Sequence, residues 1–319
     1  MPIISSTYQG PPAYLFNGHL ETIIPSLFRR VKGVSYIREK ITTPDHDFLN
    51  LDWSKVDGDR LLIISHGLEG DSRRHYAMGL VKQFNLKGID VLVWNNRSCG
   101  GEINLNPILY HHGASYDLET TVEHVLRSHS YKEIFLAGIS MGGAQTLKYL
   151  GEKGNDLPKE ITRAAVYSTP CNLASSAATL KLNQNTFYKK RFLGKLKKKI
   201  EGKAVQFPDL IDLELLKRVN DFDTFDTLFT AKLHGFKDAN DFYQGVSADN
   251  WMKFIQIPTL IINALNDPLL GPECYPTRLA EKKAEIILDM PKRGGHTGFV
   301  IPGQEFTWAE NRFAEFLLK

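Results

Sequence analysis

The sequence predicts an α/β fold: a mostly parallel, doubly wound sheet of about eight strands with an inserted helical cap. Short continuous apolar runs, typical of buried parallel strands, alternate with helix-length stretches along most of the chain. One run ends in the pattern Gly-x-Ser-x-Gly at residues 138–142, and a helix-like stretch follows at once. The alternation stops between about residues 170 and 257 and then resumes, which indicates that a separate helical segment interrupts the sheet.

The first 35 residues are predicted to form an irregular N-terminal arm. They contain Pro11-Pro12 and several aromatic side chains, so we expect the arm to pack across the protein rather than extend as a free tail. Residues 36–43 and 48–56 then alternate apolar and polar side chains, which predicts an antiparallel hairpin at one edge of the sheet.

The remaining strands are predicted from buried apolar runs at residues 61–65, 90–95, 133–137, 163–168, 258–264 and 285–290. Helices are expected at residues 73–86, 115–128, 144–150 and 305–318. The chain therefore divides into an arm (residues 1–35), a core domain (residues 36–170 and 258–319) and an inserted helical cap (residues 171–257). Both ends of the cap are expected at the edge of the sheet where Ser140 lies.

The composition is that of an ordinary globular protein. The chain has 319 residues, of which 42% are hydrophobic and 24% are charged. The net charge of +3 is too small to indicate nucleic acid as a partner. Three distant cysteines without Cys-x-x-Cys spacing suggest free thiols in a reducing compartment. With no signal-like N-terminus and no membrane-spanning apolar stretch, we expect a cytoplasmic protein. We expect no metal and no cofactor.

Ser140 is the predicted nucleophile. In a nucleophile elbow, a strand turns sharply into a helix and lifts one serine hydroxyl clear of the sheet. The turn leaves no room for side chains on either side, which explains Gly138 and Gly142, and the backbone at the serine is usually strained. The alternative is a surface turn in which Ser140 only caps the helix, but the buried strand before it favours the nucleophile.

His296 is the predicted base and Asp267 the acid that orients it. His296 lies in a glycine-rich loop between the last strand and the last helix, which can bring an imidazole over the strand ends. Asp267 follows the strand that begins at residue 258, and Pro268 fixes a turn there. The alternatives are a turn histidine and a solvated aspartate. Asp289 competes for the acid's role, but it lies within a strand and too close to the histidine loop.

The oxyanion hole is predicted to use the backbone N–H groups of Met141 and Leu68. Met141 follows the nucleophile at the helix N-terminus, and Leu68 lies in the loop after the 61–65 strand. The neighbouring His66 is expected to organise this loop rather than to act as a second base.

Several stretches together resemble the YheT-like branch of the α/β-hydrolase superfamily. They are residues 17–22, 47–53, 66–70, 96–101, 110–113, 138–143, 266–268 and 295–296. The resemblance implies a serine esterase or acyl hydrolase; some relatives act on medium-chain acyl esters or phospholipids, and some transfer the acyl group to an alcohol. Ser98 departs from the pattern, because relatives usually carry glycine there. Arg97 is interpreted as a structural ion-pair or hydrogen-bond hub beneath the site; the alternative is a substrate ligand.

The cap contains a strongly basic segment at residues 189–200. Phe192, Leu196 and Ile200 recur at helical spacing and form an apolar stripe. We expect a cap helix packed down on the site; the alternative is weak contact with an anionic membrane surface. Acidic stretches at residues 221–226 and 238–243 lack the spacing of a calcium loop.

The main hypothesis is a serine hydrolase that cleaves small-molecule or lipid-like esters with short- to medium-chain acyl groups through an acyl-enzyme. One alternative is an acyltransferase that uses the same triad. A more distant alternative is a non-catalytic protein that uses the capped pocket to bind a ligand.

Overall fold

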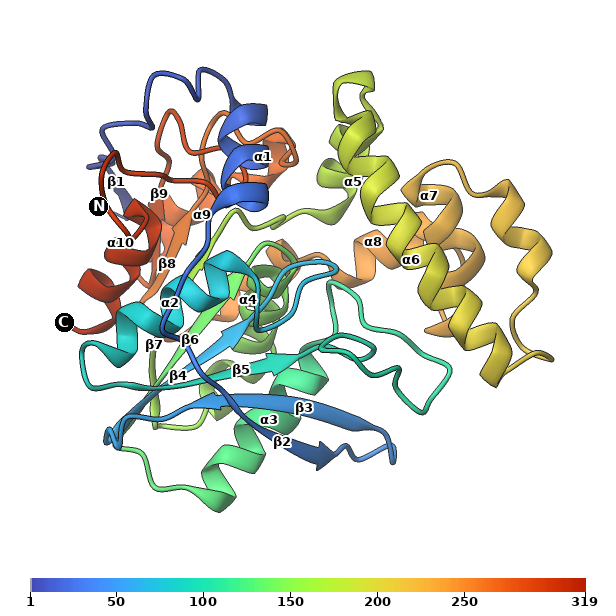
Figure 1. Cartoon of the computed structure of the whole chain (residues 1–319), viewed down its shortest axis with the longest axis horizontal. Coiled ribbons are helices and arrows are strands. Elements are labelled where there is room, and N and C mark those ends of the chain that lie inside the picture. The colour runs from blue at the N-terminus through green and yellow to red at the C-terminus, as the bar shows by residue number, and fades with distance from the viewer. Residues whose placement is uncertain (1) are drawn as a thin grey trace.

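The computed structural model describes residues 2–319 and contains one nine-stranded sheet (Figure 1). The strand order is β1-β9-β8-β7-β6-β4-β5-β3-β2, and only the pairs β5–β3 and β3–β2 are antiparallel. The predicted mostly parallel sheet is therefore confirmed. The strands are β1 (Ile3–Ile4), β2 (Ile37–Thr42), β3 (Phe48–Ser54), β4 (Arg60–Ser65), β5 (Asp90–Asn95), β6 (Glu133–Ile139), β7 (Ile161–Tyr167), β8 (Thr259–Ile262) and β9 (Ile286–Asp289).

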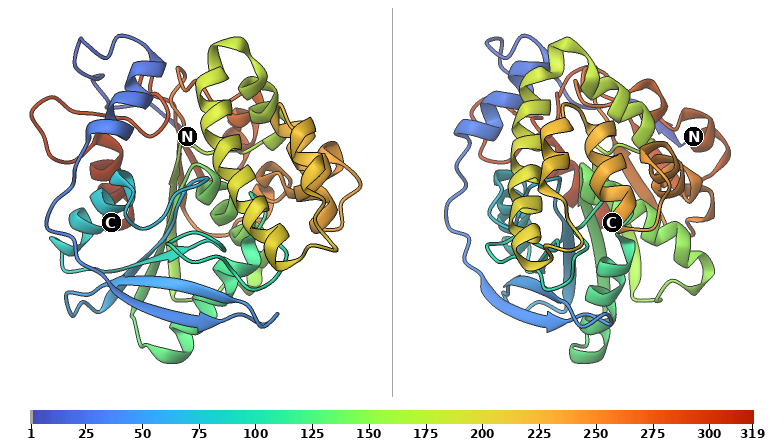
Figure 2. Two further views of the ribbon diagram at one scale, coloured as in Figure 1. Left: turned by 45° about the vertical axis from the view of Figure 1, so that its right-hand side comes forward. Right: turned by 90° about the vertical axis from the view of Figure 1, so that its right-hand side faces the viewer.

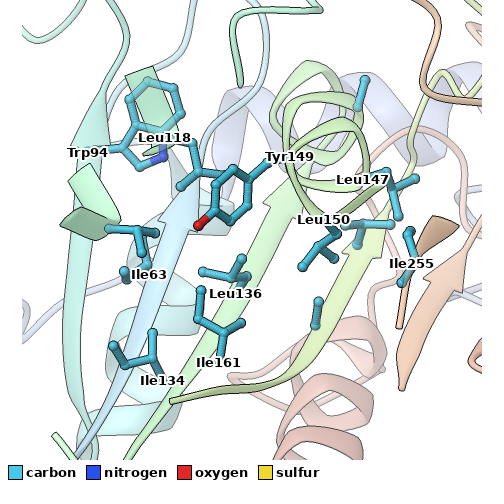
Figure 3. Packing of buried hydrophobic residues seen from close by; sticks show 14 of the residues in the cluster. Ile63, Trp94, Leu118, Ile134, Leu136, Leu147, Tyr149, Leu150, Ile161 and Ile255 are labelled. Atoms are coloured by element: carbon cyan, nitrogen blue, oxygen red, sulfur yellow. The ribbon is translucent and has the colours of Figure 1, made fainter. Parts of the chain in front are cut away.

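Helices cover both faces of the sheet, which explains why the central strands are apolar along their whole length. In β4, Leu61 and Ile63 join the core on one face, and Leu62 and Ile64 join the core on the other. Figure 3 shows Ile63 in the first core. That core is covered by α3 (Ser115–Ser128), α4 (Met141–Lys153) and α9 (Thr277–Lys282), and the opposite one by α2 (His75–Asn85) and α10 (Trp308–Leu317).

The segment between β7 and β8 is helical, and one apolar cluster consists only of side chains from this segment. Figure 2 shows its helices together on one side of the molecule. They are α5 (Leu173–Lys181), α6 (Thr186–Gln206), α7 (Phe222–Phe225), α8 (Ala239–Val246), the π-helix η4 (Asp226–Ala231) and the 3-10 helices η2 (Asn183–Asn185), η3 (Leu213–Arg218), η5 (Ala248–Asn250) and η6 (Met252–Phe254). Two further 3-10 helices, η1 (Gly154–Asp156) and η7 (Pro272–Cys274), lie in the rest of the chain. We keep the name cap for residues 171–257, with the bounds predicted from the sequence.

The apolar stripe of α6 faces the interior of the cap. Leu196 and Ile200 are buried in a second apolar cluster, and Phe192 packs against it. This placement agrees with the packed interpretation and leaves Lys190, Lys195 and Lys198, not the apolar stripe, exposed on α6. Within residues 2–319, no helix combines the length and apolar character needed to cross a bilayer.

The N-terminal arm was predicted to be irregular, and this prediction is wrong. The arm contains the helix α1 (Gly18–Phe28). The side chain of Asn17 accepts a hydrogen bond from the Leu20 N–H and caps the helix. Pro25 lies inside the helix and lacks an N–H, so propensity argues against a helix here. Burial of one face of α1 overrides that propensity, because Glu21, Thr22 and Pro25 are all buried.

Arg97 is the ion-pair hub that the sequence predicted. Its guanidinium is buried and lies 2.6 Å from an Asp45 carboxylate oxygen, 3.3 Å from Asp47 and 2.8 Å from Asp117. These contacts join the β2–β3 turn, the loop after β5 and the start of α3. The next residue, Ser98, has φ 58°, a left-handed conformation that explains why glycine suits this position.

His75, at the start of α2, is a buried histidine that the fold holds neutral. Its side chain is 8% exposed, and neither ring nitrogen has a hydrogen-bond partner among residues 2–319. Burial, together with the positive charges of Arg29, Arg74 and Arg30, lowers the pKa of His75 from 6.5 to about 3. The unfolded chain therefore binds a proton below pH 6.5 that the folded chain does not bind.

We predict that His75→Leu makes the protein more resistant to acid. Between pH 7.5 and 5.0 the protonation of His75 in the unfolded chain costs the wild type about 2 kcal/mol of folding free energy. His75→Leu should not lose this part of the folding free energy at low pH. Urea unfolding at the two pH values measures it, with His46→Asn as the control, since His46 is exposed and its φ of 61° suits asparagine. An identical pH dependence in His75→Leu and wild type would contradict the prediction.

Candidate active site

Ser140 lies at a sharp turn between β6 and α4. Its backbone has φ 56° and ψ −123°, a strained conformation for a serine. A Cβ atom on Gly138 would lie 2.6 Å from the Gly142 carbonyl oxygen, and one on Gly142 would lie 2.1 Å from the Ser65 carbonyl oxygen. Both positions therefore require glycine, for the steric reason that the sequence suggested. The Ser140 N–H donates to the Tyr167 carbonyl at 3.0 Å, which fixes the turn against β7.

The structure brings the three predicted side chains together. His296 Nε2 lies 2.9 Å from Ser140 Oγ, and His296 Nδ1 lies 2.8 Å from Asp267 Oδ2. The Asp267 carboxylate is buried and also accepts the Leu269 N–H at 2.9 Å, which fixes its orientation. The competitor Asp289 lies 3.6 Å from the Arg312 guanidinium instead. The arrangement can carry a proton from the serine hydroxyl to an imidazole held by a carboxylate.

Helix α1 holds the loop that carries His296, which sequence reasoning did not anticipate. Thr22 Oγ1 accepts the His296 N–H at 2.8 Å and donates to the Gly18 carbonyl at 2.6 Å. A Cβ atom on Gly295 would lie 2.7 Å from that same carbonyl, so the loop can approach α1 only with glycine there.

Glu21 supports the same loop one residue earlier on α1. Its buried carboxylate lies 2.7 Å from the Arg293 guanidinium, accepts the Gly294 N–H at 2.5 Å and accepts the Asn266 side-chain amide at 3.0 Å. It therefore links the loop of His296 to the turn that carries Asp267. The only sequence signal for these contacts was the stretch at residues 17–22 in the family resemblance, which gave no role to either side chain.

The loop after β4 lies against the serine. A Cβ atom on Gly67 would be 3.1 Å from the Cβ of Ser140, so Leu68 follows at the edge of the site. The N–H groups of Leu68 and Met141 donate to no protein acceptor among residues 2–319. Two free donors beside a serine hydroxyl can stabilise negative charge that develops on a bound carbonyl oxygen.

His66 organises this loop, as the sequence suggested. Its Nδ1 donates to the Gly67 carbonyl at 2.8 Å, and its Nε2 accepts the Asn96 N–H at 3.1 Å. Burial lowers the pKa of His66 to about 4, so the ring stays neutral and keeps both bonds. A neutral ring with both nitrogens engaged has a structural role.

An ion pair joins the cap to the same loop. Lys199 of α6 lies 2.8 Å from the Glu69 carboxylate, which also accepts the Tyr110 hydroxyl at 2.5 Å. Glu69 follows Leu68 directly, so this contact couples the position of α6 to that of the Leu68 N–H. The sequence did not reveal it, because residues 69 and 199 belong to separate segments.

Two cavities meet at Ser140 and His296. The first extends under the cap and is lined mainly by apolar side chains: Pro170, Leu173, Ala177, Leu180, Phe222 and Leu270. The second opens toward α1 and carries Arg74 and Arg191 on its wall. Leu68, Phe192 and Leu269 border both cavities. An ester bound with its carbonyl at Ser140 can therefore extend into an apolar chamber on one side and a cationic one on the other.

The chain has relatives among known proteins. The family model described as serine aminopeptidase, S33 matches residues 57–281, which is more than half of the chain. The Escherichia coli K12 protein YheT is 31% identical over 311 residues, which cover 94% of this chain and 90% of YheT. Human phospholipase ABHD3 is 26% identical over 328 residues, which cover 99% of this chain and 80% of its own length.

Solved structures show the same fold. The structure of the esterase Pf2001 from Pyrococcus furiosus matches with a TM-score of 0.59 at 19% identity, over 91% of this chain and 97% of the esterase.

We predict that Thr22→Val lowers kcat/KM for a neutral ester about tenfold, whereas Thr22→Ser stays near wild type. Valine keeps the shape of threonine but leaves the His296 N–H without its acceptor, and a lost hydrogen bond of this kind costs about 1–1.5 kcal/mol. Because Thr22 acts by positioning His296, the loss should fall on kcat and leave KM nearly constant. Steady-state kinetics of the two variants measure the difference. Equal kcat in Thr22→Val and wild type would show that the contact does not matter.

Proposed function

This chain belongs to the YheT-like branch of the α/β-hydrolase superfamily and is a carboxylic ester hydrolase, and we propose that Ser140, His296 and Asp267 form its catalytic triad. One observation carries the proposal: His296 Nε2 is 2.9 Å from the hydroxyl of a strained serine, and its Nδ1 is 2.8 Å from a buried carboxylate. Each contact has the length that proton transfer and ring orientation require.

In the first step, His296 Nε2 takes the Ser140 proton while Oγ attacks the ester carbonyl carbon. Asp267 accepts the Nδ1–H, holds the ring in the required tautomer and stabilises the imidazolium that forms. The carbonyl oxygen becomes negative and is bound by the N–H groups of Leu68 and Met141.

The intermediate then collapses and the ester bond breaks. His296 returns the proton to the leaving alcohol, and the acyl group stays on Ser140. A water molecule enters, gives a proton to His296 and attacks the acyl carbon. The products are the free carboxylic acid and the regenerated serine.

The cavity under the cap supports esters with short- to medium-chain acyl groups. Leu173, Ala177, Leu180 and Phe222 give it apolar walls that can bury a hydrocarbon chain. The name of the human relative, a phospholipase, is consistent with a lipid-like ester. Transfer of the acyl group to an alcohol would use the same residues; hydrolysis is the simpler reaction, and product analysis in the presence of ethanol distinguishes the two. Because the chain is an ester hydrolase, the hypothesis of a non-catalytic binding protein is set aside.

We predict that Ser140→Ala lowers the turnover of p-nitrophenyl octanoate by at least about 10⁴-fold and abolishes labelling by a fluorophosphonate probe. The substitution removes the only atom that forms the acyl-enzyme in this mechanism. Hydrolysis assays and intact mass of the labelled protein measure the two effects. Ser128→Ala is the matched control, since Ser128 is exposed at the end of α3 and should keep full activity and labelling. A probe adduct on Ser140→Ala would refute the assignment of the nucleophile.

A further inference from the structure

Two arginines in the cavity toward α1 have no acidic partner. Arg74 precedes α2 and Arg191 lies on α6, and both line the cavity that opens at Ser140. Neither forms an ion pair with any carboxylate of residues 2–319. The neighbours of Arg74 in this cavity are neutral: the Ser26 hydroxyl lies 3.4 Å from Arg74 Nη2, and the Tyr76 hydroxyl also contacts Arg74. Both guanidinium groups are therefore free to bind a ligand.

Several other arginines do have acidic partners. Arg60 and Arg163 also lack an ion pair among residues 2–319, but neither of them lines this cavity. Three other buried or half-buried arginines have carboxylates at 2.6–2.8 Å: Arg29 with Glu310, Arg97 with Asp45 and Asp117, and Arg293 with Glu21. A cation that is partly withdrawn from water without a counter-charge lowers stability. Such a local loss of stability is tolerated at a functional site.

The two positive charges also act on each other. Arg74 and Arg191 line the same cavity, and the pKa of Arg191 is lowered first by burial and then by the positive charge of Arg74. Lys195, one turn further along α6, has its pKa lowered by burial and is also influenced by both arginines. The charge of Glu69 acts in the opposite direction on Lys195, but the Glu69 carboxylate forms its ion pair with Lys199 and none with Arg74 or Arg191. The cavity wall thus carries concentrated positive charge that an anionic ligand would relieve.

The position of the arginines relative to the apolar cavity indicates which part of a substrate they contact. A hydrocarbon acyl chain fits the cavity under the cap, which begins at Ser140 and is lined by Leu173, Ala177 and Phe222. The alcohol part of the ester must then lie on the other side of Ser140, in the cavity that carries Arg74 and Arg191. The positive charge of the two arginines is consequently on the side of the leaving alcohol.

We propose that Arg74 and Arg191 bind a phosphate group on the alcohol part of the substrate, so that the enzyme prefers acyl esters of phosphorylated alcohols. This inference rests on the proposed esterase function. Guanidinium groups bind phosphate through paired, charge-assisted hydrogen bonds, and two of them on one wall match its several oxygens. The phosphorylated alcohol can be a small soluble molecule or a lipid headgroup, since both present the same group.

The test compares 1-octanoylglycerol with 1-octanoylglycerol 3-phosphate, both below their critical micelle concentrations. We expect kcat/KM of the wild type to be at least about tenfold higher for the phosphorylated ester, because charge-assisted hydrogen bonds are the stronger ones. Arg191→Gln and Arg74→Gln should each reduce this ratio, and the double variant should bring it to about one. Arg127→Gln removes an exposed arginine at the end of α3 and should keep the wild-type ratio.

A second measurement is independent of ester turnover. Octyl phosphate carries the chain and the anion but no ester, and it should inhibit p-nitrophenyl octanoate hydrolysis competitively, with a Ki at least about tenfold higher in Arg191→Gln. Dioctanoyl phosphatidate in mixed micelles distinguishes a lipid headgroup from a small soluble phosphate as the ligand. If the wild type prefers this lipid or prefers the soluble phosphorylated ester, and Arg191→Gln removes that preference, the inference is supported. The preferred substrate then identifies the source of the phosphate.

The two ways of failing are distinguishable. If neither glycerol ester is cleaved in a Ser140-dependent manner, nor any p-nitrophenyl ester, the proposed function itself is wrong. If Ser140-dependent cleavage occurs but the wild type treats both glycerol esters alike, or Arg191→Gln keeps the wild-type ratio, only the phosphate site is overturned.

Discussion

The site depends on close backbone packing around Ser140. The turn from β6 into α4 is so tight that a Cβ atom on Gly138 would meet the Gly142 carbonyl. The turn also passes so near to the end of β4 that a Cβ atom on Gly142 would meet the Ser65 carbonyl. The serine between these two glycines is forced to a φ of 56°, and its hydroxyl projects toward His296. The strained backbone persists because the turn is held in place. The Ser140 N–H donates a hydrogen bond to a carbonyl of β7, and the buried core packs beneath the turn. A side chain at either glycine would displace the hydroxyl and every contact built on it.

Three separate segments then bring the remaining groups to that hydroxyl. Helix α1 fixes the His296 loop through Glu21 and Thr22, and the loop after β4 brings the Leu68 N–H to the other side. The cap closes the apolar cavity and is tied to the Leu68 loop through Lys199 and Glu69. Residues 274 positions apart in the chain therefore share one site, so substitutions in α1 or α6 can change catalysis without touching the substrate.

Much of this site could be predicted from the sequence, because its groups follow buried strands. Ser140 and Asp267 each come directly after an apolar run, and His296 lies in a glycine-rich loop after another. Helix α1 could not be predicted, because Gly18 and Pro25 have low helix propensity and the helix is stabilised by tertiary burial. The contacts of Thr22 with His296 and of Lys199 with Glu69 depend on how distant segments pack, and no local pattern encodes that. The two unpaired arginines were equally invisible, since a lack of acidic partners is a property of the folded cavity.

The most direct test of this account is a crystal structure of the protein after reaction with an alkyl phosphonate, whose phosphorus imitates the tetrahedral intermediate. The account predicts that phosphorus is bonded to Ser140 Oγ, with its phosphoryl oxygen about 2.7–3.1 Å from the N–H groups of Leu68 and Met141. The alkyl chain should lie between Leu173 and Phe222. A phosphoryl oxygen that points away from both N–H groups, or a phosphonate bonded to a different residue, would contradict it.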